Sequence, residues 1–160
     1  MSDVKTLYDE DFLAWSKEQA EALRAAVRGG SNQALDWGNL AEEIESLGTS
    51  QKIALRSQMR RIVQHLLELQ FSPAAGPRRG WIETVSDARS EIEDLLEASP
   101  SLRNEASVAV ATALRHGSRK AISDLEKHGE LEPANAARIG ATAYTEDQIL
   151  GDWFPPETAS

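Results

Sequence analysis

The sequence contains no cysteine and no long uninterrupted apolar run. The lack of cysteine excludes a disulfide framework, a zinc–thiolate or iron–sulfur site and a thiol nucleophile. It also suits a reducing compartment, and we predict a cytoplasmic location. A membrane-spanning helix needs about 20 consecutive apolar residues. Because charged residues interrupt every apolar stretch, we expect no contact with a membrane.

Basic residues are scarcer than acidic ones, with 17 Lys and Arg against 26 Asp and Glu and a formal net charge of −9. A protein that binds nucleic acid through its phosphates needs a basic face. The composition therefore makes nucleic acid an unlikely partner. The N-terminal residues 1–8 show no charged segment followed by an apolar run, so we expect no secretory signal.

Apolar residues recur with helical spacing along almost the whole chain, and no run of alternating β-branched residues interrupts them. The 160 residues suit a single domain over 1–160, with a core over 8–129 and a tail over 130–160. The sequence thus predicts an all-α protein. We expect a compact up-and-down bundle of about five helices, on which the short C-terminal tail docks.

Five helical segments are expected from the apolar spacing and from capping residues. They cover residues 9–28, 36–47, 50–71, 81–98 and 100–127, with a loop rich in proline and glycine over 72–80. Gly48 is predicted to end the second segment, after which Thr49 or Ser50 caps the third. Ser99 and Pro100 are typical of an N-cap followed by a first helical residue, so they predict the start of the fifth segment.

A seam of small residues marks the fifth segment. It consists of Ala106, Ala109, Ala113, Gly117 and Ala121. Small residues allow another backbone to approach, and we favour a tightly packed core helix, with a kink or break at Gly117 as the alternative. In the tail, Thr145 and Gln148 have the spacing of a capping box. Trp153 and Phe154 are expected to dock on the bundle or on a second subunit.

Polar residues border the apolar stripes of three segments and form the candidate sites. They are Asp36, Asn39 and Glu43 on the second segment, Arg61, His65 and Glu68 on the third, and Arg89 on the fourth. If these borders meet, Glu43 pairs with Arg89 or His65 in a structural polar network, which is the interpretation that we favour.

The alternative interpretation is a metal- or carboxylate-dependent enzyme of hydrolase type. Its catalytic candidates are Glu43, His65 and Arg89, and its candidate metal ligands are Glu42, Glu43, His65 and Glu68. Helical bundles build metal sites from Glu and His side chains, although the Glu-x-x-His order is reversed here and occurs once. We predict no cofactor, because no other motif of this kind is present.

Arginines cluster in the middle of an otherwise acidic chain. The net charge is −6 over residues 1–50, zero over 51–100 and −3 over 101–160. The possible anion patch consists of Arg56, Arg60, Arg78 and Arg79. A local anion or nucleic-acid patch is one interpretation. A solvated face that pairs with the acidic N-terminal third is the one that we favour.

Four segments resemble a known bacterial family. They are Tyr8-Asp-Glu-Asp-Phe-Leu-Ala-Trp15, Leu35-Asp-Trp-Gly-Asn-Leu-Ala-Glu-Glu-Ile-Glu-Ser-Leu47, His65-Leu-Leu-Glu-Leu-Gln-Phe71 and Ser99-Pro-Ser-Leu102. In this order they are similar to the family called "domain of unknown function 29", over residues 6 to about 155. The second segment is the most specific of the four.

The resemblance implies a small helical bacterial protein and no particular activity. The family's signature positions correspond to Asp36, Asn39, Glu42, Glu43, Glu45, His65, Trp81 and Arg89. At one position the chain departs from the family, because Glu68 stands where a lysine is expected.

The sequence lacks the motifs of the common catalytic sites. It has no Gly-x-Ser-x-Gly elbow, no phosphate-binding Walker loop, no Gly-x-Gly-x-x-Gly and no His-Glu-x-x-His. We therefore predict a non-enzymatic protein-interaction or oligomerising module. It is expected to act as a homo-oligomer or with a protein partner.

Overall fold

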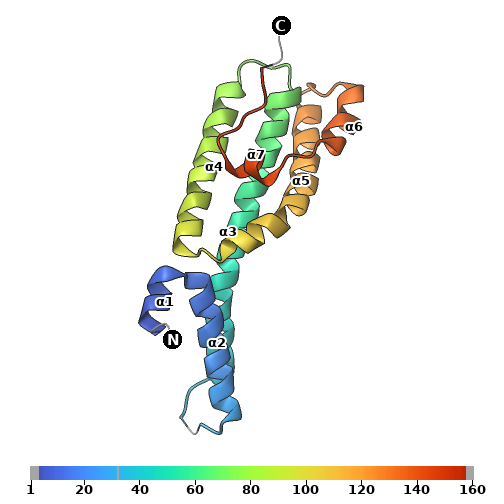
Figure 1. Ribbon diagram of the computed structural model, residues 1–160. Helices are drawn as coiled ribbons and strands as arrows, with labels where there is room; N and C mark the ends of the chain where they lie inside the picture. Colours follow the sequence, from blue (N-terminus) through green and yellow to red (C-terminus); the bar gives the residue numbers. More distant parts are fainter. Residues whose placement is uncertain (1–3, 32, 158–160) are drawn as a thin grey trace. The chain divides into compact units, whose positions relative to one another are not determined.

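The computed structural model describes residues 4–31 and 33–157, and helices make up 78 % of it with no strand in the part described. This confirms the all-α prediction. Seven helices lie in these ranges (Figure 1): α1 Val4–Glu10, α2 Phe12–Arg28, α3 Trp37–Phe71, α4 Arg78–Ala98, α5 Leu102–Lys127, α6 Pro133–Ala141 and α7 Glu146–Leu150. The two ends of the predicted domain, 1–3 and 158–160, lie outside the described residues, as does Asn32.

The chain forms two compact units. Unit 1 comprises residues 1–55 and 94–105, and unit 2 comprises residues 56–93 and 106–160. Helices α3, α4 and α5 each contribute residues to both. The expectation of a single domain over 1–160 stays a prediction, and the units are described one at a time.

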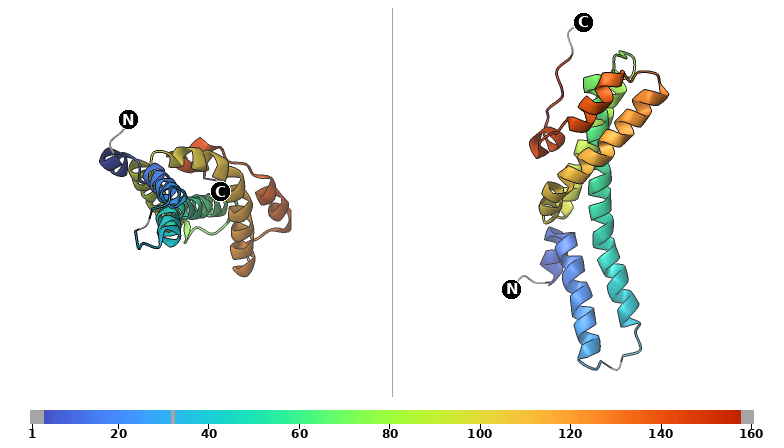
Figure 2. Two further views of the ribbon diagram at one scale, coloured as in Figure 1. Left: turned by 90° about the horizontal axis from the view of Figure 1, so that it is seen from below. Right: turned by 90° about the vertical axis from the view of Figure 1, so that its right-hand side faces the viewer.

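Unit 1 is built around α2, which lies beside the first part of α3 (Figure 2). The predicted helix over 9–28 is wrong as one element, because Asp11 interrupts it. The backbone of Asp11 is extended, at φ −154°, and its Oδ1 accepts a hydrogen bond from the backbone N–H of Ala14 at 2.9 Å. Asp11 therefore caps α2.

The turn between α4 and α5 is bonded to the start of α2. The backbone N–H of Ser101 donates to Asp11 Oδ2 at 2.8 Å, and that of Leu13 donates to Ser99 Oγ at 3.0 Å. The Ser99 hydroxyl in turn donates to Gln51 of α3. The prediction that helix five starts at Pro100 with Ser99 as its cap is wrong, because α5 begins at Leu102. The Ser99 side chain joins three segments of unit 1 instead.

Gly48 does not end a helix, and the prediction of two helices over 36–71 is wrong. Helix α3 runs without a break through this position. A Cβ added to Gly48 would lie 2.2 Å from Ser16 Oγ and 2.9 Å from Leu13 Cδ1. The glycine is thus explained by the close approach of α2, which leaves no room for a side chain.

Unit 2 holds most of the fully buried apolar side chains. Those of α3, α4 and α5 include Met59, Ile62, Val63, Leu66, Leu67, Val85, Ile92 and Leu125. The small-residue seam is buried against them, which confirms the prediction of a packed core helix. Gly117 does not break α5, since the helix is continuous from Leu102 to Lys127. A Cβ at Gly117 would lie 2.6 Å from Val63 Cγ1 and 3.1 Å from the carbonyl oxygen of Arg60.

The C-terminal segment docks on unit 2, as predicted. The capping box of α7 is present, because Gln148 N donates to Thr145 Oγ1 and Thr145 N donates to Gln148 Oε1. Beyond α7, the ring of Phe154 lies 4.8 Å from the Arg89 guanidinium carbon, a cation–π contact. Among the described helices, none has the length and apolar character to cross a lipid bilayer.

Candidate functional site

The predicted polar residues of unit 1 lie at the start of α3. Asp36 accepts hydrogen bonds from the backbone N–H of Asn39 at 3.3 Å and from the Asn39 side-chain amide at 2.7 Å. Glu42 and Glu43 lie on the next turn and are exposed. The Asp36–Asn39 pair thus satisfies a free N–H group at the helix start, which is a capping role.

Arg89 binds the C-terminal segment. Its Nε donates to the carbonyl oxygen of Ile149 at 2.9 Å, and its Nη2 donates to those of Gln148 at 2.8 Å and Trp153 at 2.7 Å. Only 7 % of the residue is exposed. Burial lowers the pKa of the guanidinium, and the charge of Asp152 acts in the opposite direction. Arg89 thus fastens α7 and the residues after it to α4.

His65 is paired with Glu68 one turn along α3. Nδ1 of His65 lies 2.8 Å from Oε2 of Glu68, and the Glu68 side chain is only 3 % exposed. This bond occupies Nδ1 of the ring, and the other ring nitrogen, Nε2, has no part in it. The bonds of His65 and Arg89 go to different groups, and Glu43 belongs to unit 1.

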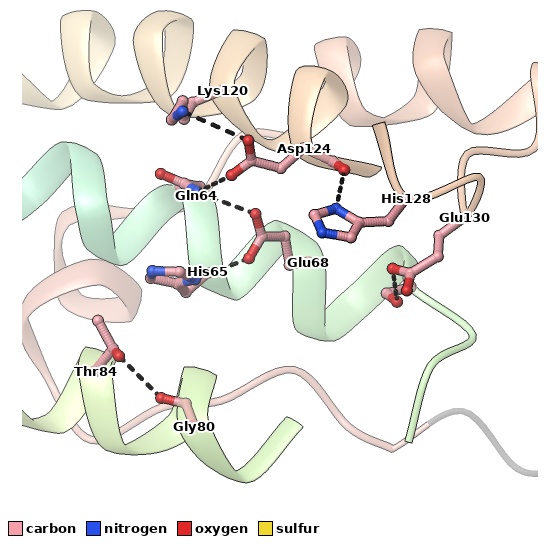
Figure 3. Close-up of polar contacts among 10 residues, drawn as sticks. Gln64, His65, Glu68, Gly80, Thr84, Lys120, Asp124, His128 and Glu130 are labelled. Atoms are coloured by element: carbon pink, nitrogen blue, oxygen red, sulfur yellow. Dashed lines mark hydrogen bonds and ion pairs between the residues drawn. The ribbon is translucent and has the colours of Figure 1, made fainter. Parts of the chain in front are cut away.

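A network of hydrogen bonds extends from this pair across to α5 (Figure 3). Nε2 of Gln64 donates to Glu68 Oε1 at 3.0 Å and to Asp124 Oδ2 at 2.7 Å. Asp124 Oδ1 lies 3.5 Å from Nζ of Lys120. Three side chains, those of Glu68, Gln64 and Asp124, therefore connect His65 to Lys120, and each oxygen of the buried Glu68 carboxyl group has a hydrogen-bond partner.

The candidate metal ligands are divided between the units. Glu42 and Glu43 belong to unit 1, whereas His65 and Glu68 belong to unit 2. Within residues 4–31 and 33–157, no group of three or more His, Asp and Glu side chains is placed to hold a metal ion. The structure brings together only the His65–Glu68 pair of the predicted set.

A groove of about 580 Å³ runs beside the network, between α3 and α5 of unit 2. Its ionisable lining residues are Arg60, Arg61 and His65 of α3 and His116, Arg119 and Lys120 of α5. The remaining lining residues are neutral and polar, and none carries a carboxylate. We call this the basic groove. It is a concentrated positive region in a chain of net negative charge.

The arginines of the basic groove have no anionic partner within the described part of the chain. Arg60, Arg61 and Arg119 are exposed, and none forms an ion pair there. Lys120 makes only the 3.5 Å contact with Asp124. The groove therefore presents at least three uncompensated positive charges to solvent, and it can attract an anion.

The basic groove overlaps the predicted anion patch at one residue, Arg60. Arg56 does not line the groove, and Arg78 donates from Nη1 to the carbonyl oxygen of Leu69 at 2.8 Å. Arg79 pairs with Glu83 at 3.0 Å, on an exposed turn of α4. The four arginines of the predicted anion patch therefore differ in their contacts, and only one of them lines the groove.

Sequence reasoning missed the α5 half of the groove. His116, Arg119 and Lys120 lie about 55 residues from their α3 counterparts along the chain. Two adjacent pairs of basic residues, Arg60-Arg61 and Arg119-Lys120, were the available signal. Only the register of α5 on α3 brings them to one place.

Comparisons with known proteins agree with the fold. A crystal structure of an alpha-helical protein of unknown function from Rhodospirillum rubrum is similar to the chain, with a TM-score of 0.69 and 23 % sequence identity. The likeness covers 92 % of this chain and 98 % of that one, and it shows a shared fold. No curated protein matches the chain. The model of the family "Domain of unknown function DUF29" matches residues 7–154, so the chain belongs to that family.

Proposed function

We propose that this protein is a non-enzymatic interaction module that binds an acidic segment of a protein partner in the basic groove. The observation that carries the proposal is a set of arginines around one groove, Arg60, Arg61 and Arg119, for which the described residues supply no anionic partner. A carboxylate-bearing segment supplies the missing partners, because the guanidinium fork binds carboxylate oxygens in pairs.

The size and position of the groove support a bound segment. Its volume of about 580 Å³ falls within the range of about 300–1,000 Å³ found for ligand sites. The arginines are exposed, so a partner reaches them from solvent without a rearrangement of the core. Complementary charge of this kind speeds association and selects the partner's sign of charge.

The roles of the other predicted site residues favour a binding module over the alternative enzyme. Arg89 holds the C-terminal segment, and Asp36 caps α3. Both oxygens of Glu68 already have hydrogen-bond partners. A catalytic set needs groups that reach one reacting atom, whereas each of these side chains has its own structural partner.

Fluorescence anisotropy with a labelled oligo-glutamate peptide tests the proposal. We expect wild-type protein to bind it through the basic groove. The double variant Arg60→Ala/Arg119→Ala is expected to bind at least about tenfold more weakly, which corresponds to about 1.4 kcal/mol. Arg79→Ala is the matched control, because the Arg79 side chain is 91 % exposed and lies outside the groove.

Failure of wild-type protein to bind the oligo-glutamate peptide contradicts the proposal, and so does an equal loss of binding in Arg79→Ala and in the double variant. The second result indicates an unspecific effect of charge. Sedimentation velocity on the protein alone examines the predicted homo-oligomer. Self-association that the Arg60→Ala/Arg119→Ala variant abolishes would identify the acidic segment as part of a second copy.

A further inference from the structure

We infer that the basic groove prefers a phosphate monoester to a carboxylate as the anionic group that it binds. The inference rests on the proposed function, because it names the chemistry that the groove selects. Nothing in the family assignment or the similar structure assigns a ligand to this surface.

The first argument is the number of positive charges and their arrangement on two walls. Arg60 and Arg61 stand on α3, and Arg119 and Lys120 stand on α5. A carboxylate carries one charge on two oxygens, and a single guanidinium fork satisfies it. A phosphate monoester carries about −1.5 to −2 charges at pH 7 on three oxygens. Those oxygens point in tetrahedral directions, so they can accept from both walls at once.

The second argument is the closeness of the two walls. The position of a Cβ at Gly117 is only 3.1 Å from the carbonyl oxygen of Arg60. The two residues thus lie at the same level of the packed helices, and the contact has no side chain in between. Arg119 and Lys120 follow within one turn of Gly117 on α5. The close contact therefore keeps the two walls of the groove near one another, and basic residues of both helices line it.

The third argument concerns the nearby carboxylates, Glu68 and Asp124. Both accept hydrogen bonds from Gln64, and neither lines the groove. Glu68 also binds Nδ1 of His65, and Asp124 contacts Lys120. These acids are therefore satisfied by protein donors. They hold His65 and Lys120 along the groove rather than compete for its arginines.

A phosphate monoester can come from a phosphorylated side chain of a partner protein or from a small phosphorylated molecule. We test the shared chemistry with three labelled peptides of one sequence, which carry serine, glutamate or phosphoserine at the central position. Binding is measured by fluorescence anisotropy at fixed ionic strength, because electrostatic affinities depend on salt. We expect the phosphoserine peptide to bind at least about tenfold more tightly than the glutamate peptide.

Variants locate the preference in the groove. Arg60→Ala and Arg119→Ala are expected to remove the phosphoserine advantage, and Arg79→Ala is expected to keep it. Both groove arginines are exposed, so these variants should fold, which circular dichroism checks. For wild-type protein, amide NMR shifts around Gly117 on titration with the phosphoserine peptide give a second measurement that needs no variant.

The outcomes separate this inference from the proposed function. Equal affinity for the glutamate and phosphoserine peptides overturns the phosphate preference and leaves the acidic-segment proposal standing. No binding of either peptide overturns both. Free phosphoserine that competes at the affinity of the peptide supports the phosphate chemistry and assigns it to a small molecule. Tighter binding of an oligothymidylate than of the phosphopeptide overturns the inference, because it identifies a nucleic-acid backbone as the ligand.

Discussion

The two units of this chain differ in charge and in how well they bury apolar residues. Unit 1 has 13 acidic against 6 basic residues, a net charge of −7, while unit 2 has 13 against 11, a net charge of −2. Among the described residues, eight large apolar side chains are exposed, and six of them belong to unit 1. In unit 1, Ala41 is the only buried residue among the described residues of 21–47. The stability of the described fold is therefore concentrated in unit 2.

Helix α3 shows that the difference in burial between the two units does not come from a difference in apolar spacing. Leu40 and Leu47 are 41 % and 52 % exposed, whereas Met59, Ile62 and Leu66 of the same helix are fully buried. All five follow the apolar spacing of one helix. The burial of one large apolar side chain contributes about 1.5–3 kcal/mol to stability. Whether a side chain of α3 is buried depends on how many neighbours surround its part of the helix.

The largest expected effect is the removal of Arg89 in unit 2. Arg89→Ala leaves the carbonyl groups of Gln148, Ile149 and Trp153 without their donor. We expect a loss of about 3 kcal/mol in the free energy of unfolding, since buried groups without a partner are costly. Urea denaturation measures the loss, and hydrogen exchange should show faster exchange over 146–154. A stable variant with unchanged exchange contradicts the role given to Arg89.

A second pair of variants compares the helix contacts of the two units. Gly117→Ala places a Cβ against the branched Val63 side chain and a backbone oxygen, and we expect a cost of about 2 kcal/mol. Gly48→Ala meets side-chain atoms of Ser16 and Leu13 and no backbone atom, so its cost is expected to be smaller, about 1 kcal/mol. Both are measured by denaturant unfolding. If Gly48→Ala proved the more damaging, the view of unit 2 as the tighter unit would be wrong.

A third prediction concerns pH and the buried Tyr144, whose hydroxyl donates to Gln70 Oε1 at 2.7 Å. Burial raises the pKa of Tyr144, so the folded state favours the neutral phenol. Its contribution to stability is complete below the unfolded pKa of about 10 and is lost as the pH rises above it, by up to about 1.4 kcal/mol per pH unit. Tyr144→Phe is expected to be less sensitive between pH 9 and 11 in urea denaturation. An identical pH dependence in both proteins would contradict this.

The smallest expected effect is in unit 1. Leu47→Ser changes a side chain that is already 52 % exposed, and we expect a change below about 0.5 kcal/mol in the free energy of unfolding. The measurement is made at two protein concentrations. A larger loss that grows on dilution would show that a second molecule covers this face, and the contrast between the units would then need revision.

The helices could be predicted from the sequence because their signals are local. Apolar spacing located the main helices, and the Thr145–Gln148 capping box and the docked Trp153 and Phe154 were correct. The errors came at Asp11, Gly48 and Pro100, where one residue type has two common uses. A glycine can end a helix, or it can lie inside a helix where a second helix packs too closely for a side chain. Only the presence of that second helix distinguishes the two roles.

The candidate site was predictable only in part. The wheel position of His65 placed it at the border of the core, and the structure pairs it with Glu68 in the same helix. The partners of Arg89 could not be foreseen, because they are backbone carbonyls about 60 residues further along the chain. Every residue has a backbone carbonyl group, so the sequence does not show which of them an arginine will bind.

The sequence by itself determined the all-helical class, the acidic character and the family, since helical periodicity, composition and family motifs are properties of the chain alone. The tertiary structure decided which charges meet. Arg60 and Arg119 form one groove only because Gly117 lets α5 lie directly on α3 in a single register. A shift by one residue turns a helical side chain by about 100°, so this register, which no local pattern encodes, creates the basic groove.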